Sequence, residues 1–317
     1  MANSESQENP FATLPVNRIR LTPTGGWMGP ASHLAATRER LLALEFETFN
    51  HRMVGTSLGA EISGIDLTQP LEEKQVAELR RALCEFKVLI FREQAVNSTQ
   101  HVEFARHFGE LEIHPFIPSN TDHPELVRFE KTAEIAGYEN TWHHDVTWRE
   151  NPSMGAILHA LEVPQIGGDT LFADMHAAYQ GLDPGIQKQI DGLSAVHDYM
   201  RAFGHTVAPD EAEKMRERFP EVIHPVVRTH PETSERSLFV NAVFTREILG
   251  VSAEESEALI EHLGSEASCP EYQIRVRWEP DTLVFWDNRA VMHYASSDYW
   301  PQRRVMERAS VIGDRPV

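Results

Sequence analysis

The chain has little of several things that would mark particular protein classes. Only two of its 317 residues are cysteines, Cys84 and Cys269, which is too few for a disulfide or cysteine-based metal framework. Such sparse cysteine usage fits a reducing compartment. The first 18 residues lack a basic start followed by an apolar core, so we expect no secretory signal. No apolar run approaches the roughly 18–20 residues that span a bilayer. We therefore expect a soluble cytoplasmic protein.

Basic residues are also scarce. The chain has 29 Lys and Arg against 48 Asp and Glu, for a formal net charge of −19 at pH 7. This charge argues against non-specific binding to nucleic acid or to an anionic membrane. Any anionic ligand must instead be met by locally placed arginine or lysine. We expect a small-molecule partner, with no nucleic acid and no membrane.

What the chain does contain is enough apolar sequence for one large domain or two small ones, since 41% of its residues are hydrophobic. Residues 1–45 are polar and rich in proline and glycine, which predicts a flexible or surface-wrapping N-terminal extension with a short helix over 35–44. Residues 46–317 are predicted to form the globular domain.

The apolar pattern predicts an α/β (α+β) fold. Helix-like spacing over 71–86 is followed by a short apolar strand at 87–91, and Ser98 is the predicted N-cap of a helix over 98–108. Beyond residue 111, short apolar runs separated by Pro, Gly, Asp and Asn predict strands. Helices are expected over 177–193 and 252–263, the second capped by Ser252. The many short strands favour a double-stranded β-helix (jelly roll) core with flanking helices over a parallel sheet.

The most informative stretch is Trp142-His-His-Asp-Val-Thr147. On an extended segment, residues i and i+2 point to the same side, so His143 and Asp145 can offer two ligand atoms to one point while His144 points away. Two histidines and one carboxylate form the facial triad that holds non-haem Fe(II) and leaves positions open. The triplet alone is weak evidence in a chain with 16 histidines.

The third ligand is expected far along the chain, because distant strands of a jelly roll meet inside the barrel. His293 is the best candidate, ahead of four histidines that are as well explained as hydrogen-bonded core residues: His114, His159, His224 and His230. Downstream, Arg304, Met306 and Arg308 alternate, so both guanidinium groups face one side of a predicted strand. Two such cations need an anion if they point inward, and an Arg fork suits a carboxylate. On a solvated edge strand they would only form surface salt bridges.

Taken together, these stretches resemble the taurine dioxygenase/TfdA family of Fe(II)- and 2-oxoglutarate-dependent oxygenases. The resemblance covers roughly residues 53–316 and depends on the order and spacing of six motifs. These are Trp-His143-x-Asp145-Val-Thr, Gly167-Gly-Asp-Thr170, His224-Pro-Val-Val-Arg-Thr-His-Pro231, Leu238-Phe-Val-Asn241, Trp286-Asp-Asn-Arg…His293-Tyr-Ala and Pro301-Gln-Arg-Arg304…Arg308.

The resemblance implies a role for each of these residues. His143, Asp145 and His293 would be the catalytic iron ligands. Thr170 would contact the end of 2-oxoglutarate nearest the metal, Arg304 would pair with its distal carboxylate, and Arg308 would serve both cosubstrate and substrate. The family uses O2 to convert 2-oxoglutarate to succinate and CO2 and to hydroxylate an unactivated C–H bond. Related halogenases lack the carboxylate ligand, so Asp145 favours hydroxylation. The resemblance also implies a homo-oligomer, a dimer or tetramer.

The resemblance to the taurine enzyme is only partial among the residues that would bind the substrate. His114 matches a histidine that contacts the sulfonate in the taurine enzyme, and Val146, Phe203 and Phe244 match pocket walls. Two positions depart from it. Ile117 replaces a pocket tyrosine, and Glu139 replaces an asparagine. Glu139 would either pair with a cationic amine of the substrate or lie exposed on a loop. His144, where the family usually has a small polar residue, is expected to pack behind the ligands.

The predicted substrate is therefore a small organic acid, either a sulfonate such as taurine or a carboxylate. Residues 199–220, a charged and partly helical insertion, are predicted to form part of a lid over the site. Two alternatives stay open. The same cofactor chemistry could give desaturation, epimerisation or ring formation on a secondary metabolite, or the chain could be a non-catalytic metal-binding or sugar-binding jelly roll, which fold alone does not exclude.

Overall fold

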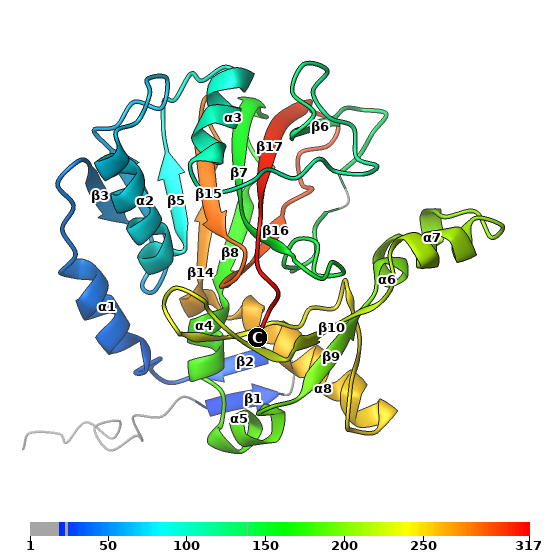
Figure 1. Cartoon of the computed structure of the whole chain (residues 1–317). Helices are drawn as coiled ribbons and strands as arrows, with labels where there is room; N and C mark the ends of the chain where they lie inside the picture. The colour runs from blue at the N-terminus through cyan, green and yellow to red at the C-terminus, as the bar shows by residue number, and fades with distance from the viewer. Residues whose placement is uncertain (1–18, 23–24, 138) are drawn as a thin grey trace, which may run out of the picture.

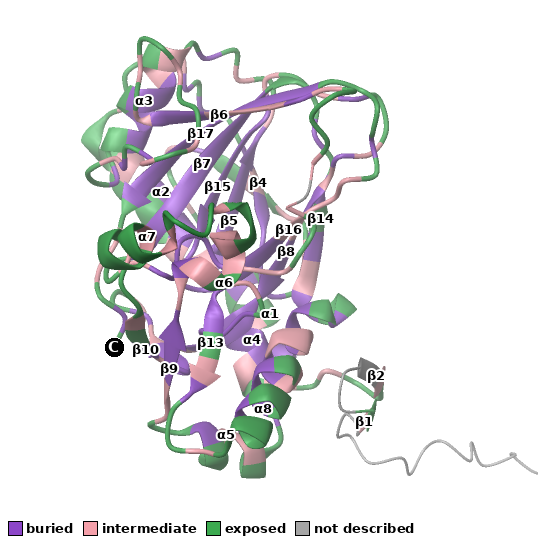
Figure 2. Cartoon of the chain, turned by 90° about the vertical axis from the view of Figure 1, so that its right-hand side faces the viewer, coloured by how far each residue is buried: buried purple, intermediate pink, exposed green. Residues whose placement is uncertain are grey.

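The computed structural model describes residues 19–22, 25–137 and 139–317, and its centre is a large mixed sheet (Figure 1). Seven strands form it, in the order β3 (Asn50–Met53), β4 (Ala60–Ser63), β5 (Val88–Phe91), β15 (Leu283–Asp287), β7 (Ser153–Glu162), β17 (Arg304–Ile312) and β6 (Leu126–Lys131). All neighbours run antiparallel except β4 and β5, which are parallel. The central strands β15 and β7 are buried, except for the last two residues of β7 (Figure 2).

A second sheet covers one face of the first. It has three antiparallel strands, in the order β14 (Gln273–Val276), β8 (Thr170–Asp174) and β16 (Val291–Ala295). Side chains from both sheets share one core cluster, in which Val284 and Trp286 of β15 lie with Phe172 of β8 and Val291 of β16. The alternate residues of β15, Leu283 and Phe285, belong to a different core on the opposite face. Burial on both faces explains why this strand is apolar without alternation.

Two helices cover that opposite face, α2 (Glu73–Phe86) and α3 (Ser98–Arg106). The predicted helix over 71–86 is thus confirmed, with Leu79, Leu83 and Phe86 on its buried side. The predicted cap of α3 was wrong by one residue. Asn97, not Ser98, is the N-cap, because its side chain accepts a hydrogen bond from the backbone of Gln100 while the Gln100 side chain accepts one from the backbone of Asn97.

The single helix predicted over 177–193 is two helices, α4 (Met175–Gln180) and α5 (Pro184–Ile190). Gly181 ends the first, and Asp183 caps the second by accepting a hydrogen bond from the backbone of Gly185. Pro184 fits the first helical turn but cannot continue an existing helix, which explains the break. By contrast, Ser252 does cap α8 (Ala253–Ser265), as predicted, through the backbone N–H of Glu255.

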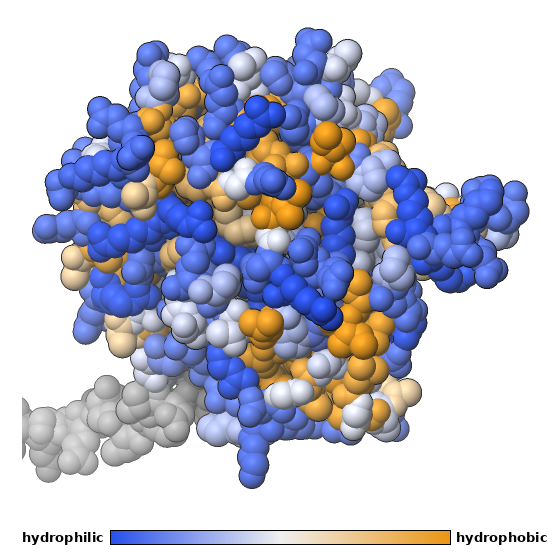
Figure 3. Space-filling view, in the orientation of Figure 1, coloured by the Kyte–Doolittle hydropathy of each residue, from blue (hydrophilic) through white to orange (hydrophobic). Residues whose placement is uncertain are grey.

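The remaining elements lie at one end of the two sheets. They comprise the antiparallel strands β9 (Ser194–His197), β10 (Val222–Pro225) and β13 (Thr245–Ile248), the pair β11 (Val227–Thr229) and β12 (Arg236–Leu238), and the short helices η2 (Glu266–Ser268) and η3 (Pro270–Tyr272). Between β9 and β10, the helices α6 (Tyr199–Phe203), η1 (Gly204–Thr206) and α7 (Ala212–Arg218) project from the body (Figure 1). The projecting end has a mainly hydrophilic surface (Figure 3).

The described part of the predicted N-terminal extension contacts the rest of the chain. Its hairpin of β1 (Ile19–Thr22) and β2 (Gly25–Met28) leads to α1 (Leu34–Leu42). Arg20 donates hydrogen bonds to Glu266 and Ser265, both at 2.6 Å, and Leu41 is fully buried in the core. Residues 1–18 of the predicted extension lie outside the described residues. Among the described helices, none is long and apolar enough to cross a membrane.

Candidate metal centre

His143 and His293, 150 positions apart in the chain, are brought together by an isolated antiparallel bridge. The backbone N–H of each donates to the carbonyl of the other, at 3.1 and 2.9 Å, and the two imidazole rings lie 4.2 Å apart. His293 comes from β16 of the smaller sheet, so the loop that carries His143 is fixed to that sheet. With Asp145 they offer three ligand atoms that lie within 4.8 Å of one another.

Asp145 lies at the start of a turn directly after the bridge. Its backbone is held twice by the buried side chain of Asn288, which accepts from its N–H at 2.8 Å and donates to its carbonyl at 3.0 Å. Val146 follows with φ of +48°, a conformation that a β-branched residue rarely adopts. His144 points away from the ligands and is fully buried beside Phe239. The predicted division between ligand face and packing face is therefore what the structure has.

The carboxylate of Asp145 lies between the two imidazoles, 3.9 Å from Nε2 of His143 and 3.8 Å from Nε2 of His293. One nitrogen of Arg308 donates to both of its oxygens at 3.0 Å. Burial alone would raise the pKa of Asp145, but Arg308 and the two histidines outweigh it and lower the pKa to about 2. Burial lowers the pKa of His293 to about 3, so this ring is neutral and able to bind a metal.

The predicted 2-oxoglutarate contacts lie on the same side of the site. Thr170 is two residues before Phe172, the cross-strand partner of His293, so its side chain shares the ligands' face of the sheet. Its hydroxyl accepts a hydrogen bond from Trp278 at 3.0 Å. Arg304 is only 7% exposed and, within the described part of the chain, forms no ion pair. A buried guanidinium without a counter-ion is a site for an anionic ligand, so these residues fit a bound 2-oxo acid.

The predicted substrate wall is partly aromatic. Val146, Phe203 and Phe244 belong to one cluster, and the Phe203 and Phe244 rings are 6.1 Å apart. The backbone N–H of Ile117 donates to Nδ1 of His114 at 3.1 Å, which leaves the other ring nitrogen to face a ligand. Burial, aided by nearby arginines, lowers the pKa of His114 to about 3, so at neutral pH it is an uncharged hydrogen-bond donor.

Sequence reasoning missed two parts of this region. The first is a group of aromatic rings that extends the wall, formed by Phe116, Trp148, Tyr199 and Phe219. The second is Lys131, which pairs with Glu139 at 2.7 Å. The spacing of Phe116, two residues after His114 on the same chain segment, was a usable signal for the first. No local pattern links Lys131 to Glu139.

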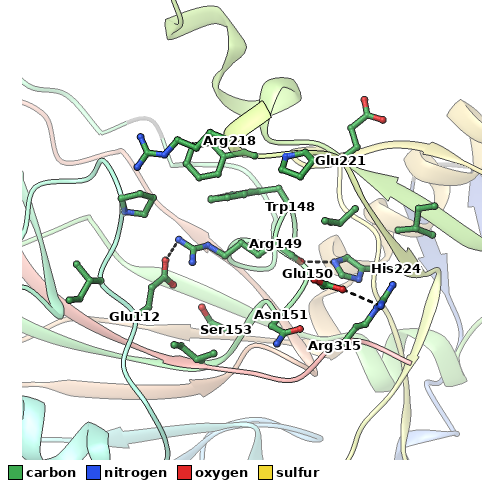
Figure 4. A pocket seen from close by; sticks show the side chains of 17 residues that line it. Glu112, Trp148, Arg149, Glu150, Asn151, Ser153, Arg218, Glu221, His224 and Arg315 are labelled. Atoms are coloured by element: carbon green, nitrogen blue, oxygen red, sulfur yellow. Dashed lines mark hydrogen bonds and ion pairs between the residues drawn. The ribbon is translucent and has the colours of Figure 1, made fainter. Parts of the chain in front are cut away.

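A pocket of about 850 Å³ lies beside the metal centre and contains none of its three ligands (Figure 4). Its wall includes the ion pair between Glu112 and Arg149 and the pair between Arg315 and Glu150. His224, one of the alternative ligand candidates, lines this pocket and contacts the backbone carbonyls of Thr147 and Arg149. Trp148 and Phe219 also line this pocket, so it borders the aromatic wall although it contains no candidate metal ligand.

A second group of possible ligands, Cys84, His230 and Asp287, has a different character. Asp287 is already held by Arg289, at 2.8 and 2.6 Å, and by Nε2 of His230 at 3.0 Å. The other ring nitrogen of His230 accepts from the backbone N–H groups of residues 232 and 233. Burial and the nearby carboxylates raise the pKa of Cys84 to about 12, so it is a neutral thiol. The cluster is a buried ion-pair network, and its cysteine, Cys84, forms no disulfide.

The comparisons with known proteins agree with this geometry. A family model described as "Taurine catabolism dioxygenase TauD, TfdA family" matches residues 50–310. This chain belongs to the TauD/TfdA family. An alkylsulfatase from Acinetobacter baylyi is 36% identical over 265 residues, which are 81% of this chain and 83% of the relative. An alpha-ketoglutarate-dependent sulfate ester dioxygenase from Pseudomonas putida is 35% identical, over 87% of this chain and 92% of the relative.

Solved structures agree as well. The structure of AAD-2 in complex with Mn(II) and N-oxalylglycine superposes with a TM-score of 0.74 at 30% identity, covering 85% of this chain and 99% of the other. The prediction of an Fe(II)- and 2-oxoglutarate-dependent dioxygenase acting on a small organic molecule is confirmed by these relatives. The non-catalytic alternative is set aside, because a TauD/TfdA-family chain with a complete ligand group is an enzyme of this class.

Proposed function

We propose that this TauD/TfdA dioxygenase uses His143, Asp145 and His293 to hold Fe(II), and Thr170 and Arg304 to hold 2-oxoglutarate. When bound, iron would activate O2, and 2-oxoglutarate would supply two of the four electrons that O2 takes up, leaving succinate and CO2 as coproducts. The protein's part is positional. Asn288 and Arg308 orient Asp145, the bridge between residues 143 and 293 orients the imidazoles, and the buried walls exclude water.

We infer that the substrate is a small anion with an apolar body: a sulfonate, a carboxylate or a sulfate ester. One observation carries this inference: the ring of Phe116 connects the aromatic wall with His114, a neutral hydrogen-bond donor close to the guanidinium of Arg308. Its ring lies 4.5 Å from that of His114 and 5.6 Å from that of Phe203. His114 and Arg308 would bind the acidic group, and the aromatic wall with Phe244 would hold the apolar part. Relatives named for alkyl sulfates and sulfate esters support such a substrate.

Taurine itself fits this site less well than an alkyl sulfonate. Its ammonium group would need a carboxylate, and the candidate that the sequence offers, Glu139, already pairs with Lys131 at 2.7 Å. Ile117 also presents an apolar side chain where the taurine enzyme has a tyrosine hydroxyl. We therefore expect an unfunctionalised alkyl or aryl chain to be accepted better than an aminoalkyl chain.

A substrate panel tests this proposal. Hexyl sulfate, hexanesulfonate, hexanoate and taurine would each be supplied with Fe(II), 2-oxoglutarate and O2, with hexan-1-ol as the neutral control, and succinate would be measured. The six-carbon anions should turn over faster than taurine, and the alcohol should stay at background. Turnover of the alcohol at the rate of the anions would mean that the acidic-group assignment is wrong. If taurine is the best substrate, the argument from Glu139 fails.

The mass of the product distinguishes hydroxylation from the remaining alternative, desaturation. A gain of one oxygen means hydroxylation, whereas a loss of two hydrogens means desaturation. With a sulfate ester, hydroxylation of the carbon that bears the ester oxygen gives a product that expels sulfate and leaves an aldehyde. Released sulfate is thus a second readout of the same reaction.

The finer fold assignment is also a proposal. The seven-stranded and three-stranded sheets, which face each other across one core, would be the two halves of the jelly roll. Residues 199–220 would form part of a lid, since Tyr199 and Phe219 pack on Trp148 while α7 is exposed (Figure 2). Fe(II) with 2-oxoglutarate should protect this segment from proteolysis, and unchanged cleavage would count against a lid. A cytoplasmic homo-oligomer, a dimer or tetramer, stays a prediction, and light scattering in solution tests its size.

A further inference from the structure

A buried lysine lies next to the arginine that is proposed to bind the distal carboxylate of 2-oxoglutarate. Lys131, at the end of β6, is the direct cross-strand partner of Arg304, at the start of β17. Side chains of directly opposed residues in an antiparallel pair lie on the same side of the sheet. Both residues are buried, with exposed fractions of 8% and 7%. Two cations therefore share one buried corner of the site.

Glu139 is the carboxylate that enters this corner. Its Oε1 lies 2.7 Å from Nζ of Lys131. A side chain added at Gly137 would meet the hydroxyl of Tyr299 at 2.9 Å and Oε2 of Glu139 at 3.6 Å, so the bare backbone of residue 137 lets the loop lie close over Tyr299. The guanidinium carbon of Arg304 is 5.8 Å from the centre of the same tyrosine ring. Tyr299 thus lies between the loop and the arginine.

Within the described part of the chain, the charges of this corner leave one cation, Arg304, without a carboxylate partner. Lys131 and Glu139 neutralise each other, and Asp169, the other acid close to Arg304, is paired with Arg275 at 2.6 Å. The remaining charge is that of Arg304, which matches the single distal carboxylate of the cosubstrate. Without Lys131, the negative charge of Glu139 would lose this balancing cation in the corner where a second carboxylate must bind. Like charges at close range in a buried site repel strongly.

The ion pair also ties the loop of the first metal ligand to the sheet. Glu139 lies four residues before His143, and Thr141, between them, accepts a hydrogen bond from Nδ1 of His143 at 2.7 Å. The start of the loop is fixed separately, since the indole of Trp300 donates to the carbonyl of Ala133 at 3.0 Å. The loop therefore connects the buried corner beside Arg304 to the imidazole of His143.

We propose that Lys131 is a positioning residue for the cosubstrate, which neutralises Glu139 and so makes the corner beside Arg304 acceptable to a dicarboxylate. The proposal rests on the proposed function. It assigns Glu139, which replaces the asparagine of the taurine enzyme, to the cosubstrate end of the site instead of to a substrate amine. An acid in this place requires the cation that this chain supplies from the neighbouring strand.

The test compares Lys131→Met, Glu139→Gln and the double variant. The dissociation constant of N-oxalylglycine, a non-reacting analogue of 2-oxoglutarate, would be measured by calorimetry on the Mn(II)-loaded protein. Arg303→Met is the matched control, because Arg303, directly before β17, forms an exposed ion pair with Glu130 of β6 at 2.7 Å. The Mn(II) affinity of every variant is measured first, and circular dichroism checks its fold.

We expect Lys131→Met to weaken N-oxalylglycine binding tenfold or more. Glu139→Gln should bind at least as tightly as wild type, and the double variant should recover to within about threefold of it, as should Arg303→Met. Equal binding by Lys131→Met and wild type would overturn the proposal. So would a double variant as weak as Lys131→Met, since the lysine would then act other than through Glu139.

If Lys131→Met does not fold, N-oxalylglycine binding by Glu139→Gln still tests the proposal. Tenfold weaker binding by this variant would show that the carboxylate helps the cosubstrate instead of needing neutralisation, which overturns the proposal. A wild-type protein that binds Mn(II) but not N-oxalylglycine would overturn the proposed function itself, and this inference with it. A wild type that binds while the variants depart from the expected pattern overturns the inference alone.

Discussion

A single nitrogen of Arg308 donates to both carboxylate oxygens of Asp145, at 3.0 Å each. The same guanidinium lies 5.1 Å from the ring of Phe129, so it is held from a second side. Asp145 is thereby fixed between the imidazoles of His143 and His293 before any metal binds. We therefore propose that Arg308 orients Asp145 for metal binding, in addition to its proposed contact with the substrate.

Arg308→Ala should weaken metal binding. Removing a hydrogen-bond partner that orients a ligand typically costs 10–100-fold in metal affinity, and we expect a loss on the order of tenfold or more here. Calorimetric titration with Mn(II) measures it. Metal affinity equal to wild type would show that Asn288, which holds the backbone of Asp145, is sufficient to orient the ligand.

Arg304→Ala should act on the cosubstrate and leave the metal in place. Loss of one member of a buried ion pair costs ~3–5 kcal/mol, so the KM for 2-oxoglutarate should rise on the order of a hundredfold or more. Mn(II) affinity should change little. Arg303→Ala is the control, because that neighbouring side chain is exposed and bonds Glu130 on the surface. If Arg304→Ala keeps the wild-type KM, its assignment to the distal carboxylate fails.

How far the sequence could predict this site is clearest from these residues. The three candidate ligands, which the structure brings together, could be selected because an i, i+2 pair and a distant histidine came with two alternating arginines. Arg304 and Arg308 do lie on one strand, β17, as predicted. Lys131 could not be predicted from a local motif, because it lies opposite Arg304 only through the register between β6 and β17. No sequence pattern near either residue indicates that register.

The fold shows the same division. Apolar runs predicted strands such as 283–286 well, because burial on both faces removes the need for alternation. The prediction of one long helix over 177–193 was wrong, because residues that end and start helices interrupt the apolar spacing. Gly181 and Pro184 divide it, and Asp183 restarts it with a cap. Such breaks depend on the backbone geometry of two or three residues, whereas the spacing of apolar residues is judged over a whole helix.

Asp287→Asn should destabilise the protein in a pH-dependent way. Burial raises the pKa of Asp287, but Arg289 and His230 outweigh it and hold the pKa below its usual value. The carboxylate's stabilising contribution is therefore complete above the unfolded pKa of about 3.9 and is lost as the pH falls toward the folded pKa. We expect a loss of ~3–5 kcal/mol in the free energy of unfolding at pH 7.

Urea unfolding of wild type and Asp287→Asn from pH 7 down to pH 3 measures this effect. The gap between the two proteins should be constant above about pH 5 and narrow below about pH 4. Asp191→Asn is the control, because Asp191 forms an exposed ion pair with Arg236 that should contribute less than ~1 kcal/mol. A gap that stays constant to pH 3 would contradict the buried ion-pair assignment.

Cys84 should be slow to react with alkylating agents in the native protein. Its pKa of about 12 leaves only a small thiolate fraction at pH 8, on the order of a thousandfold less than for a free thiol of pKa about 8.5. Mass spectrometry after iodoacetamide treatment measures the rate, with the urea-unfolded protein as reference. Alkylation of native Cys84 at the unfolded rate would mean that the thiol is ionised, as a metal ligand would be.

The most direct test of the account is succinate formation by wild type and Asp145→Asn, with Fe(II), 2-oxoglutarate, O2 and the best substrate of the panel. Asp145→Asn keeps the size of the side chain and removes the carboxylate ligand, and circular dichroism confirms its fold. The account predicts substrate-dependent succinate from wild type and background from the variant, as from His143→Ala. Succinate formed by Asp145→Asn at the wild-type rate would contradict a metal centre built on His143, Asp145 and His293.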